Sequence, residues 1–276
     1  MTARTPTTTD VFQFLLLTDL HLPPPGELVH GRDTAARLEA VLADIAARHG
    51  PGGTLPPVAF AVLTGDLARD GEPAAYARLK AMLAAALPCP AHLMLGNHDD
   101  RVAFRAAFAD APVDPSGFVQ QALPTPAGLF LLLDTLDQGK HGGRLCERRL
   151  AWLKVRLEES GDAPAFLFLH HPPMQVGIAG MDAIALADPE ALWAVLAPHR
   201  ACIRHLFHGH LHRPIAGSWR GIPISSLRGS AFDVALDLAP PPRRVTVEPA
   251  LAPNYALVRV RGEDVVVHTR ALPPSA

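Results

Sequence analysis

The sequence predicts an α/β fold, and three observations lead to this prediction. Short apolar runs of strand length alternate along residues 11–212 with segments whose apolar residues recur at helical spacing. The runs are continuously apolar, as in strands that are covered on both faces. After His212 the composition changes, and Gly, Pro and short β-like runs dominate. We therefore expect an α/β domain followed by a β-rich C-terminal part.

The expected strands of the α/β part are continuous apolar runs, each short enough to form one buried strand. They are Val11–Thr18, Val58–Thr64, His92–Leu95, Leu129–Asp134, Ala165–His170 and Ile203–His208.

The expected helices lie between these runs. They are Asp33–His49, Pro73–Leu87, Glu147–Ser160 and a helix that begins at Asp188-Pro189-Glu190. Gly50 follows the first helix as a stop signal. Asp188 has the pattern of an N-cap, with Pro189 at the first helical position.

The C-terminal runs predict antiparallel strands and hairpins. They are Ile215–Trp219, Ile222–Ser226, Val234–Leu238, Val245–Glu248, Tyr255–Arg261 and Val265–Thr269. We divide the chain into an N-terminal tail (1–10), a main domain (11–230) and a β-rich extension (231–276). The extension is expected to complete a sheet or to form a dimer contact.

Composition narrows the function classes. The 276 residues are 49% apolar, which is enough for one large core, and the net charge of −2 gives no overall basic surface for nucleic acid. The apolar run Val11–Leu17 is far shorter than the roughly 20 residues of a membrane span and lacks the flanks of a signal peptide. Three widely spaced cysteines favour a reducing compartment without structural disulfides. The sequence thus predicts a soluble cytoplasmic protein with no membrane or nucleic-acid partner.

Metal-ligating residue types follow the ends of five expected strands. In an extended segment, residues i and i+2 point to the same side, so Asp19 and His21 can bind one ion, and His210 and His212 show the same spacing. Because strand ends converge at one edge of a sheet, Asp66, Asn97 and His170 should lie nearby. Nitrogen and oxygen ligands without a thiolate suit Mn²⁺, Fe, Zn²⁺, Co²⁺ or Ni²⁺.

These blocks, in this order from Asp19 to His212, resemble the calcineurin-like metallophosphoesterase superfamily. The segment His170-His171-Pro172-Pro173 followed by 177–182 is similar to the class III cyclic-nucleotide and glycerophosphodiester phosphodiesterases. The resemblance implies a four-layer αββα sandwich of two mixed sheets flanked by helices. It implies two divalent metal ions (Mn, Fe, Zn or Co) with a bridging hydroxide. One ion would take Asp19, His21, Asp66 and His212, and the other Asp66, Asn97, His170 and His210.

The resemblance also implies hydrolysis of small phosphodiesters, such as cyclic nucleotides or glycerophosphodiesters. The catalytic residues would be Asp66, Asn97 and His98, with His98 facing the phosphoryl group and Asp99 orienting its ring. His171 and His208 are expected to point away from the site. His30 and His141 lack partner spacing and are expected to be ordinary surface or core residues.

Three alternatives stay open. The same ligand set serves a phosphomonoesterase, and a nuclease or a non-catalytic scaffold could share the fold. The apolar segment 175–187 favours the diester, because it offers no cationic side chains for a monoester dianion. A homodimer is expected from the exposed strand candidates of the extension.

Overall fold

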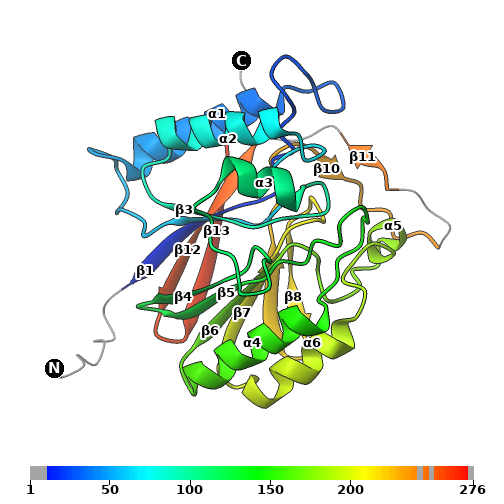
Figure 1. Cartoon of the computed structure of the whole chain (residues 1–276). Coiled ribbons are helices and arrows are strands. Elements are labelled where there is room, and N and C mark those ends of the chain that lie inside the picture. The colour runs from blue at the N-terminus through cyan, green and yellow to red at the C-terminus, as the bar shows by residue number, and fades with distance from the viewer. Residues whose placement is uncertain (1–10, 241–244, 249–251, 273–276) are drawn as a thin grey trace.

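The structure is a computed structural model that describes residues 11–240, 245–248 and 252–272. The predicted N-terminal tail, residues 1–10, lies outside the described residues. Two large sheets stack face to face, and helices cover the outer face of each, as Figure 1 shows. The predicted αββα layering is therefore confirmed.

The first sheet has the strand order β13-β12-β1-β2-β3. Strands β1, β2 and β3 run parallel, while β12 pairs antiparallel with β1 and β13 antiparallel with β12. The C-terminal hairpin therefore lies beside the first strand of the chain. The strands are β1 (Phe12–Leu17), β2 (Ala61–Leu63), β3 (Ala91–Leu93), β12 (Asn254–Arg261) and β13 (Asp264–Ala271).

The second sheet has the order β4-β5-β6-β7-β9-β8. Its inner strands β5, β6, β7 and β9 are parallel, and β4 and β8 pair antiparallel at the two edges. The strands are β4 (Gln121–Thr125), β5 (Gly128–Leu132), β6 (Ala165–Leu169), β7 (Ile203–His208), β8 (Ile215–Trp219) and β9 (Ile222–Ser226). A separate pair, β10 (Asp233–Val234) and β11 (Val247–Glu248), completes the described strands.

The first sheet is covered by α1, α2 and α3, and the second by α4 and α6 (Figure 1). Short α5 and a 3₁₀ turn, η1, lie in the connections. The helices are α1 (Thr34–His49), α2 (Pro73–Ala86), α3 (Arg101–Ala107), α4 (Glu147–Ser160), α5 (Ala179–Asp182), α6 (Pro189–Leu196) and η1 (Ala197–His199). Asp33 and Asp188 cap α1 and α6 through their side chains, and Pro189 occupies the first turn of α6.

Alternation along the strands produces three apolar layers. In β1, Phe14 and Leu16 face the other sheet, whereas Leu15 and Leu17 face the helices. In β6, Phe166 and Phe168 face the first sheet, and the alternate residues Ala165, Leu167 and Leu169 pack under α4 and α6. Both faces are buried, which explains why the sequence of these strands is continuously apolar.

Several elements differ from the sequence prediction. Helices α3 and α5 and strand β4 were not predicted, since α3 and α5 are short and β4 carries Pro124 at a sheet edge, where a missing N–H is tolerated. The predicted strand Val234–Leu238 is wrong beyond Val234, where β10 ends.

Other properties follow from the described chain. No helix among the described residues is long and apolar enough to cross a membrane. Cys89, Cys146 and Cys202 are free thiols.

Candidate metal centre

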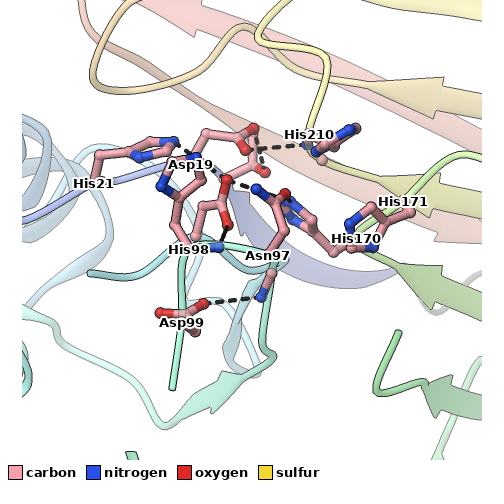
Figure 2. A network of polar contacts seen from close by, with 12 residues as sticks. Asp19, His21, Asn97, His98, Asp99, His170, His171 and His210 are labelled. Carbon is pink, nitrogen blue, oxygen red and sulfur yellow. Dashed lines mark hydrogen bonds and ion pairs between the residues drawn. The ribbon is translucent and has the colours of Figure 1, made fainter. Parts of the chain in front are cut away.

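The seven predicted ligand residues come together where strands β1, β2, β3, β6 and β7 end, and Figure 2 labels Asp19, His21, Asn97, His170 and His210 among them. Six of them are buried, with Asn97 the half-buried exception. The first sheet supplies both carboxylates, the amide and one imidazole, and the second sheet supplies the other three imidazoles. The residues are Asp19, His21, Asp66, Asn97, His170, His210 and His212.

Asp19, His21, Asp66 and His212 form one compact group. One ligand atom from each lies within 4.8 Å of those of the others. The Nε2 atoms of His21 and His212 are 3.1 Å apart, and His21 Nε2 is 3.3 Å from Asp66 Oδ2. Two ring nitrogens and a carboxylate oxygen thus converge on one point, as the ligands of a cation would.

Asp66 also faces a second group. Its Oδ2 lies 3.4 Å from His170 Nε2, which in turn is 3.2 Å from Asn97 Oδ1. His170 and His210 belong to another compact group of potential ligand atoms, whose third member is His171. Asp66 is therefore the carboxylate shared by the two sides of the centre.

The backbone at the ligands differs from the extended conformation that the sequence suggested. The φ angles are positive at Asp19 (53°), His21 (43°), Asp66 (50°), His210 (70°) and His212 (50°). The expectation of an extended backbone at these residues is therefore wrong. Left-handed turns bring Asp19 and His21 into one group of potential ligand atoms and direct His210 and His212 to different groups. Such conformations cost about 1–3 kcal/mol each and persist where surrounding contacts enforce them.

Backbone contacts between loops enforce these turns. The N–H groups of Asp19 and His21 donate to the carbonyls of Gly65 and Asp66 at 3.2 and 2.9 Å. The His210 N–H donates to Asp19 Oδ1 at 3.0 Å. Gly96 lets its loop approach so closely that a Cβ there would overlap the Asp66 carboxylate.

Two imidazoles of the candidate centre are oriented by carbonyls behind them. His170 Nδ1 donates to Thr64 O at 2.8 Å, and His212 Nδ1 donates to Phe232 O at 2.9 Å. Because Nδ1 holds the proton in each neutral ring, Nε2 presents its lone pair to the centre. This is the arrangement that usually orients metal-bound histidines.

Among the charged groups of the candidate centre, the Asp66 carboxylate has the strongest influence on the pKa values of His21 and His170. Despite burial, His170 and His21 hold the pKa of the Asp66 carboxyl well below its usual range. Burial lowers the pKa of His21 to about 4, whereas His170, although buried, has a pKa raised to about 9 by the Asp66 charge. A cation on Nε2 of His170 would compete with that proton.

A buried polar atom without a hydrogen-bond partner is a further sign of a cation site. Among the described residues, His210 Nε2 has no hydrogen-bond partner although it is buried. A buried polar atom without a partner is costly, and a coordinated cation would satisfy it. The nitrogen and oxygen donors, with no thiolate, fit the divalent ions expected from the sequence.

His98 is oriented differently from the sequence prediction. Its N–H donates to Asp66 Oδ1 at 2.9 Å, and its ring Nδ1 donates to the carbonyl of Arg69 at 2.7 Å. The expectation that Asp99 orients this ring is wrong. Asp99 is buried below the cluster (Figure 2). It accepts from Leu67 N, Ala68 N and Gly96 N of the neighbouring loops and from Tyr76 OH of α2.

The expectation that His171 points away is also wrong. Its ring lies 4.7 Å from that of His210 and 4.8 Å from that of His170. Both of its ring nitrogens nevertheless have partners, because Nδ1 accepts from Thr135 Oγ1 at 2.8 Å and Nε2 donates to His141 O at 3.1 Å. With no lone pair left for a cation, His171 is better suited to support the centre than to bind metal.

A pocket of about 470 Å³ opens beside these residues. One end is polar and contains Asp66, Asn97, His98, His210 and His212. The walls beyond it are mostly apolar and come from α5 and its neighbours and from the β10–β11 region. The wall residues include Met181, Ile184, Phe232, Val234 and Val247.

His30 and His141 also line this pocket, contrary to the expectation that they are ordinary residues. Neither lies at the end of a strand, so the spacing pattern that revealed the other histidines missed them. Asp182 does not line the pocket, and its carboxylate caps the turn before α5 by accepting from Val176 N and Gly177 N at 2.7 and 3.0 Å.

Known proteins with related sequences share most of the chain. A probable cyclic nucleotide phosphodiesterase of Rhodopseudomonas palustris is 45% identical over 260 residues, which cover 93% of this chain and 91% of the relative. The 3′,5′-cyclic adenosine monophosphate phosphodiesterase CpdA of Pseudomonas aeruginosa is 29% identical, covering 95% and 90%. The glycerophosphodiester phosphodiesterase GpdQ of Enterobacter lignolyticus is 32% identical over 63% of each chain.

Solved structures show the same fold. A dimetal phosphatase from Danio rerio superposes with a TM-score of 0.64 at 18% identity, covering 93% of this chain and 98% of that one. The family model of the calcineurin-like phosphoesterases matches residues 12–214, which span all seven predicted ligands. The chain therefore belongs to the calcineurin-like phosphoesterase family.

Proposed function

We propose that the protein hydrolyses small phosphodiesters, with cyclic nucleotides as the favoured class, using two divalent cations. The observation that carries the proposal is the pocket, in which a cluster of metal-ligand atoms adjoins a mainly apolar wall. The proposed ligands are Asp19, His21, Asp66 and His212 for one ion and Asp66, Asn97, His170 and His210 for the other.

Ions bound there would activate a water molecule as the nucleophile and offset the charge of the phosphoryl oxygens. The protein side chains would orient the substrate around them. Because His98 Nδ1 donates to the Arg69 carbonyl, Nε2 is the nitrogen left to face the substrate, and it would donate to a phosphoryl oxygen when the ring carries a second proton. Its backbone N–H also holds Asp66 Oδ1, which couples the position of His98 to the shared ligand.

The walls of the pocket favour a diester over a monoester. A diester carries a second substituent, and the pocket has space for it next to Phe232 and Ile184. A monoester dianion gains most from cationic side chains, and none of the lining residues in the described part of the chain is Lys or Arg. The names of the relatives, cyclic nucleotide and glycerophosphodiester phosphodiesterases, support the same choice.

Substrate and metal panels test the proposal. Purified protein, stripped and reloaded with Mn²⁺, Fe²⁺, Zn²⁺ or Co²⁺, should hydrolyse bis(p-nitrophenyl) phosphate and 3′,5′-cyclic AMP faster than p-nitrophenyl phosphate. Two ions per chain should be present in the active form. Near-exclusive cleavage of the monoester would reject the diester, and full activity with one ion would reject the two-ion centre.

His98 can be tested separately from the ligands. Replacing His98 with Ala should lower turnover by about 10²-fold or more, the usual range for a lost acid or transition-state contact, and leave the metal content unchanged. Loss of metal together with activity would instead make His98 a ligand. The cytoplasmic location and the homodimer remain predictions from the sequence.

A further inference from the structure

His141 presents a second imidazole to the pocket that contains His98. Its side chain is exposed and lines the pocket, and its ring centroid lies 6.2 Å from that of His98. The two rings come from opposite sheets, since His98 follows β3 and His141 lies in the connection between β5 and α4. A substrate bound at the centre would therefore meet an imidazole from each sheet.

The segment that carries His141 is held in place by buried groups. His171 Nε2 donates to the His141 carbonyl, and Thr135 Oγ1 donates to the other nitrogen of the His171 ring. Both His171 and Thr135 are fully buried. Gly143 packs so closely on His171 that a Cβ at this position would overlap the ring.

Further backbone hydrogen bonds hold the same segment from both sides. Gly143 N donates to Ala185 O at 3.1 Å, and Ala187 N donates back to Gly143 O at 2.8 Å. Arg144 N donates to Thr135 O at 2.9 Å. The His141 carbonyl is thus held by His171, and the residues that follow it are held by three backbone hydrogen bonds, so the segment that carries His141 has a fixed position.

The two imidazoles occupy different depths. His98 lies against the ligands, with its ring 4.6 Å from that of His21 and its N–H on Asp66. Its Nδ1 is held by the Arg69 carbonyl, so His98 approaches the substrate with one nitrogen only. His141 has no ring contact with a proposed metal ligand among the described residues, and it lies on the outer side of His98.

The geometry points to a division of labour: His98 binds the phosphoryl group, and His141 is the catalytic residue that protonates the leaving ester oxygen. This inference rests on the proposed phosphodiesterase function. His171 donates to the His141 carbonyl and does not line the pocket, so it is the positioning residue for His141. From the sequence, His98 is expected to face the phosphoryl group, and His141 has no assigned role.

Hydrolysis replaces the ester oxygen on phosphorus with the oxygen of water. The oxygen of a water molecule forms a bond to phosphorus, and one of the two water protons passes to solvent. At the same time, the bond from phosphorus to the leaving ester oxygen breaks. The electron pair of that bond stays on the ester oxygen, which takes a proton from the His141 imidazolium. The alcohol departs, and the neutral His141 ring regains a proton from solvent.

Two substrates of nearly equal size test the assignment. Methyl p-nitrophenyl phosphate and methyl phenyl phosphate differ mainly in the basicity of the leaving oxygen, and only phenolate needs a proton to leave easily. In the metal-loaded full chain, His141→Ala should reduce kcat for the phenyl ester by about 10²-fold and kcat for the nitrophenyl ester by less than about threefold. Metal content should stay at the wild-type value.

Matched variants separate the alternatives. His268→Ala, which removes an exposed histidine on β13, should leave both esters unaffected. An equal loss on both esters in His141→Ala, or a leaving-group-dependent loss in His98→Ala but not in His141→Ala, would overturn the division of labour. If the metal-loaded wild type cleaves neither ester nor 3′,5′-cyclic AMP, the proposed function itself fails, which is a distinct result.

Discussion

The two sheets hold their loops at the centre by different means. On the side of the first sheet, the buried Asp99 carboxylate accepts hydrogen bonds from four groups, three of them backbone N–H groups of the loops that carry Asp66 and Asn97. On the side of the second sheet, the neutral His171 ring accepts one hydrogen bond from Thr135 and donates one to His141 O.

The difference has a physical basis in the two groups. A carboxylate has several acceptor sites, so it can gather donors from two loops at once. An imidazole joins a single donor to a single acceptor, so it fixes only one loop. Burial, with the Asp66 charge, raises the pKa of Asp99 to about 6, and burial next to His170 lowers that of His171 well below its usual range. Substitution of Asp99 should therefore displace the loops that carry Asp66 and Asn97. Substitution of His171 should displace the pocket segment that carries His141.

The largest effect is expected at Asp66, which both sides share. Asp66→Ala should empty or scramble both metal positions and reduce turnover by at least about 10²–10³-fold. Metal analysis of the purified variant, with the diester assay, checks this. An inactive variant that still holds two ions per chain would show that Asp66 is not the shared ligand.

Asp99→Ala should have the next largest effect, because three buried N–H groups lose their acceptor. We expect about 3–5 kcal/mol less stability and roughly 10–100-fold weaker metal binding. Chemical denaturation and metal titration measure the two quantities. Asp99→Asn keeps one acceptor oxygen and should lie between Ala and the wild type, whereas wild-type metal affinity in the Ala variant would contradict the role.

Thr135→Val should affect only the side of the second sheet, where His171 holds the segment that carries His141. The change keeps the shape of the side chain and removes the donor to His171, for an expected loss of about 1 kcal/mol of stability. Metal content should stay normal, and kcat for methyl phenyl phosphate should fall more than kcat for methyl p-nitrophenyl phosphate. A loss of metal in this variant would mean that the two sides are not separate.

Asp44 should give the smallest effect and leave the centre untouched. This residue of α1 binds Arg270 of β13, Tyr255 of β12 and Arg48, and the Arg270 hydrogen bonds come first among the causes that hold the pKa of Asp44 well below its usual range. Since the folded pKa is depressed, the contribution is complete at neutral pH and is lost as the pH falls below about 4.

Asp44→Asn should therefore be about 1 kcal/mol less stable than the wild type at pH 7, and the gap should narrow at pH 3. Denaturant midpoints at the two pH values measure this difference. A gap that widens on acidification would contradict the assignment, as would any change in metal content.

Much of the fold and the position of the candidate ligands could be predicted because buried parallel strands are continuously apolar and end in polar residues. Strands β8 and β9 have the predicted bounds, and the candidate ligands after β1, β2, β3, β6 and β7 lie close together as expected. What was missed depends on tertiary contacts. His141 reaches the pocket because Thr135 and His171 hold its loop, and no local spacing records that contact. Proximity in sequence predicts that Asp99 orients the His98 ring. In the structure, the groups that donate hydrogen bonds to Asp99 come mainly from the loop after β2 and from α2.

The pairing of β1 with β12 has a consequence for synthesis of the chain. All strands of the second sheet lie between Gln121 and Ser226, so they can assemble as soon as this stretch has left the ribosome. The first sheet must wait, because β12 and β13 follow β1 by more than two hundred residues. One edge of β1 should thus stay open through most of translation, exposed to chaperones or to wrong partners, until the C-terminal hairpin closes it.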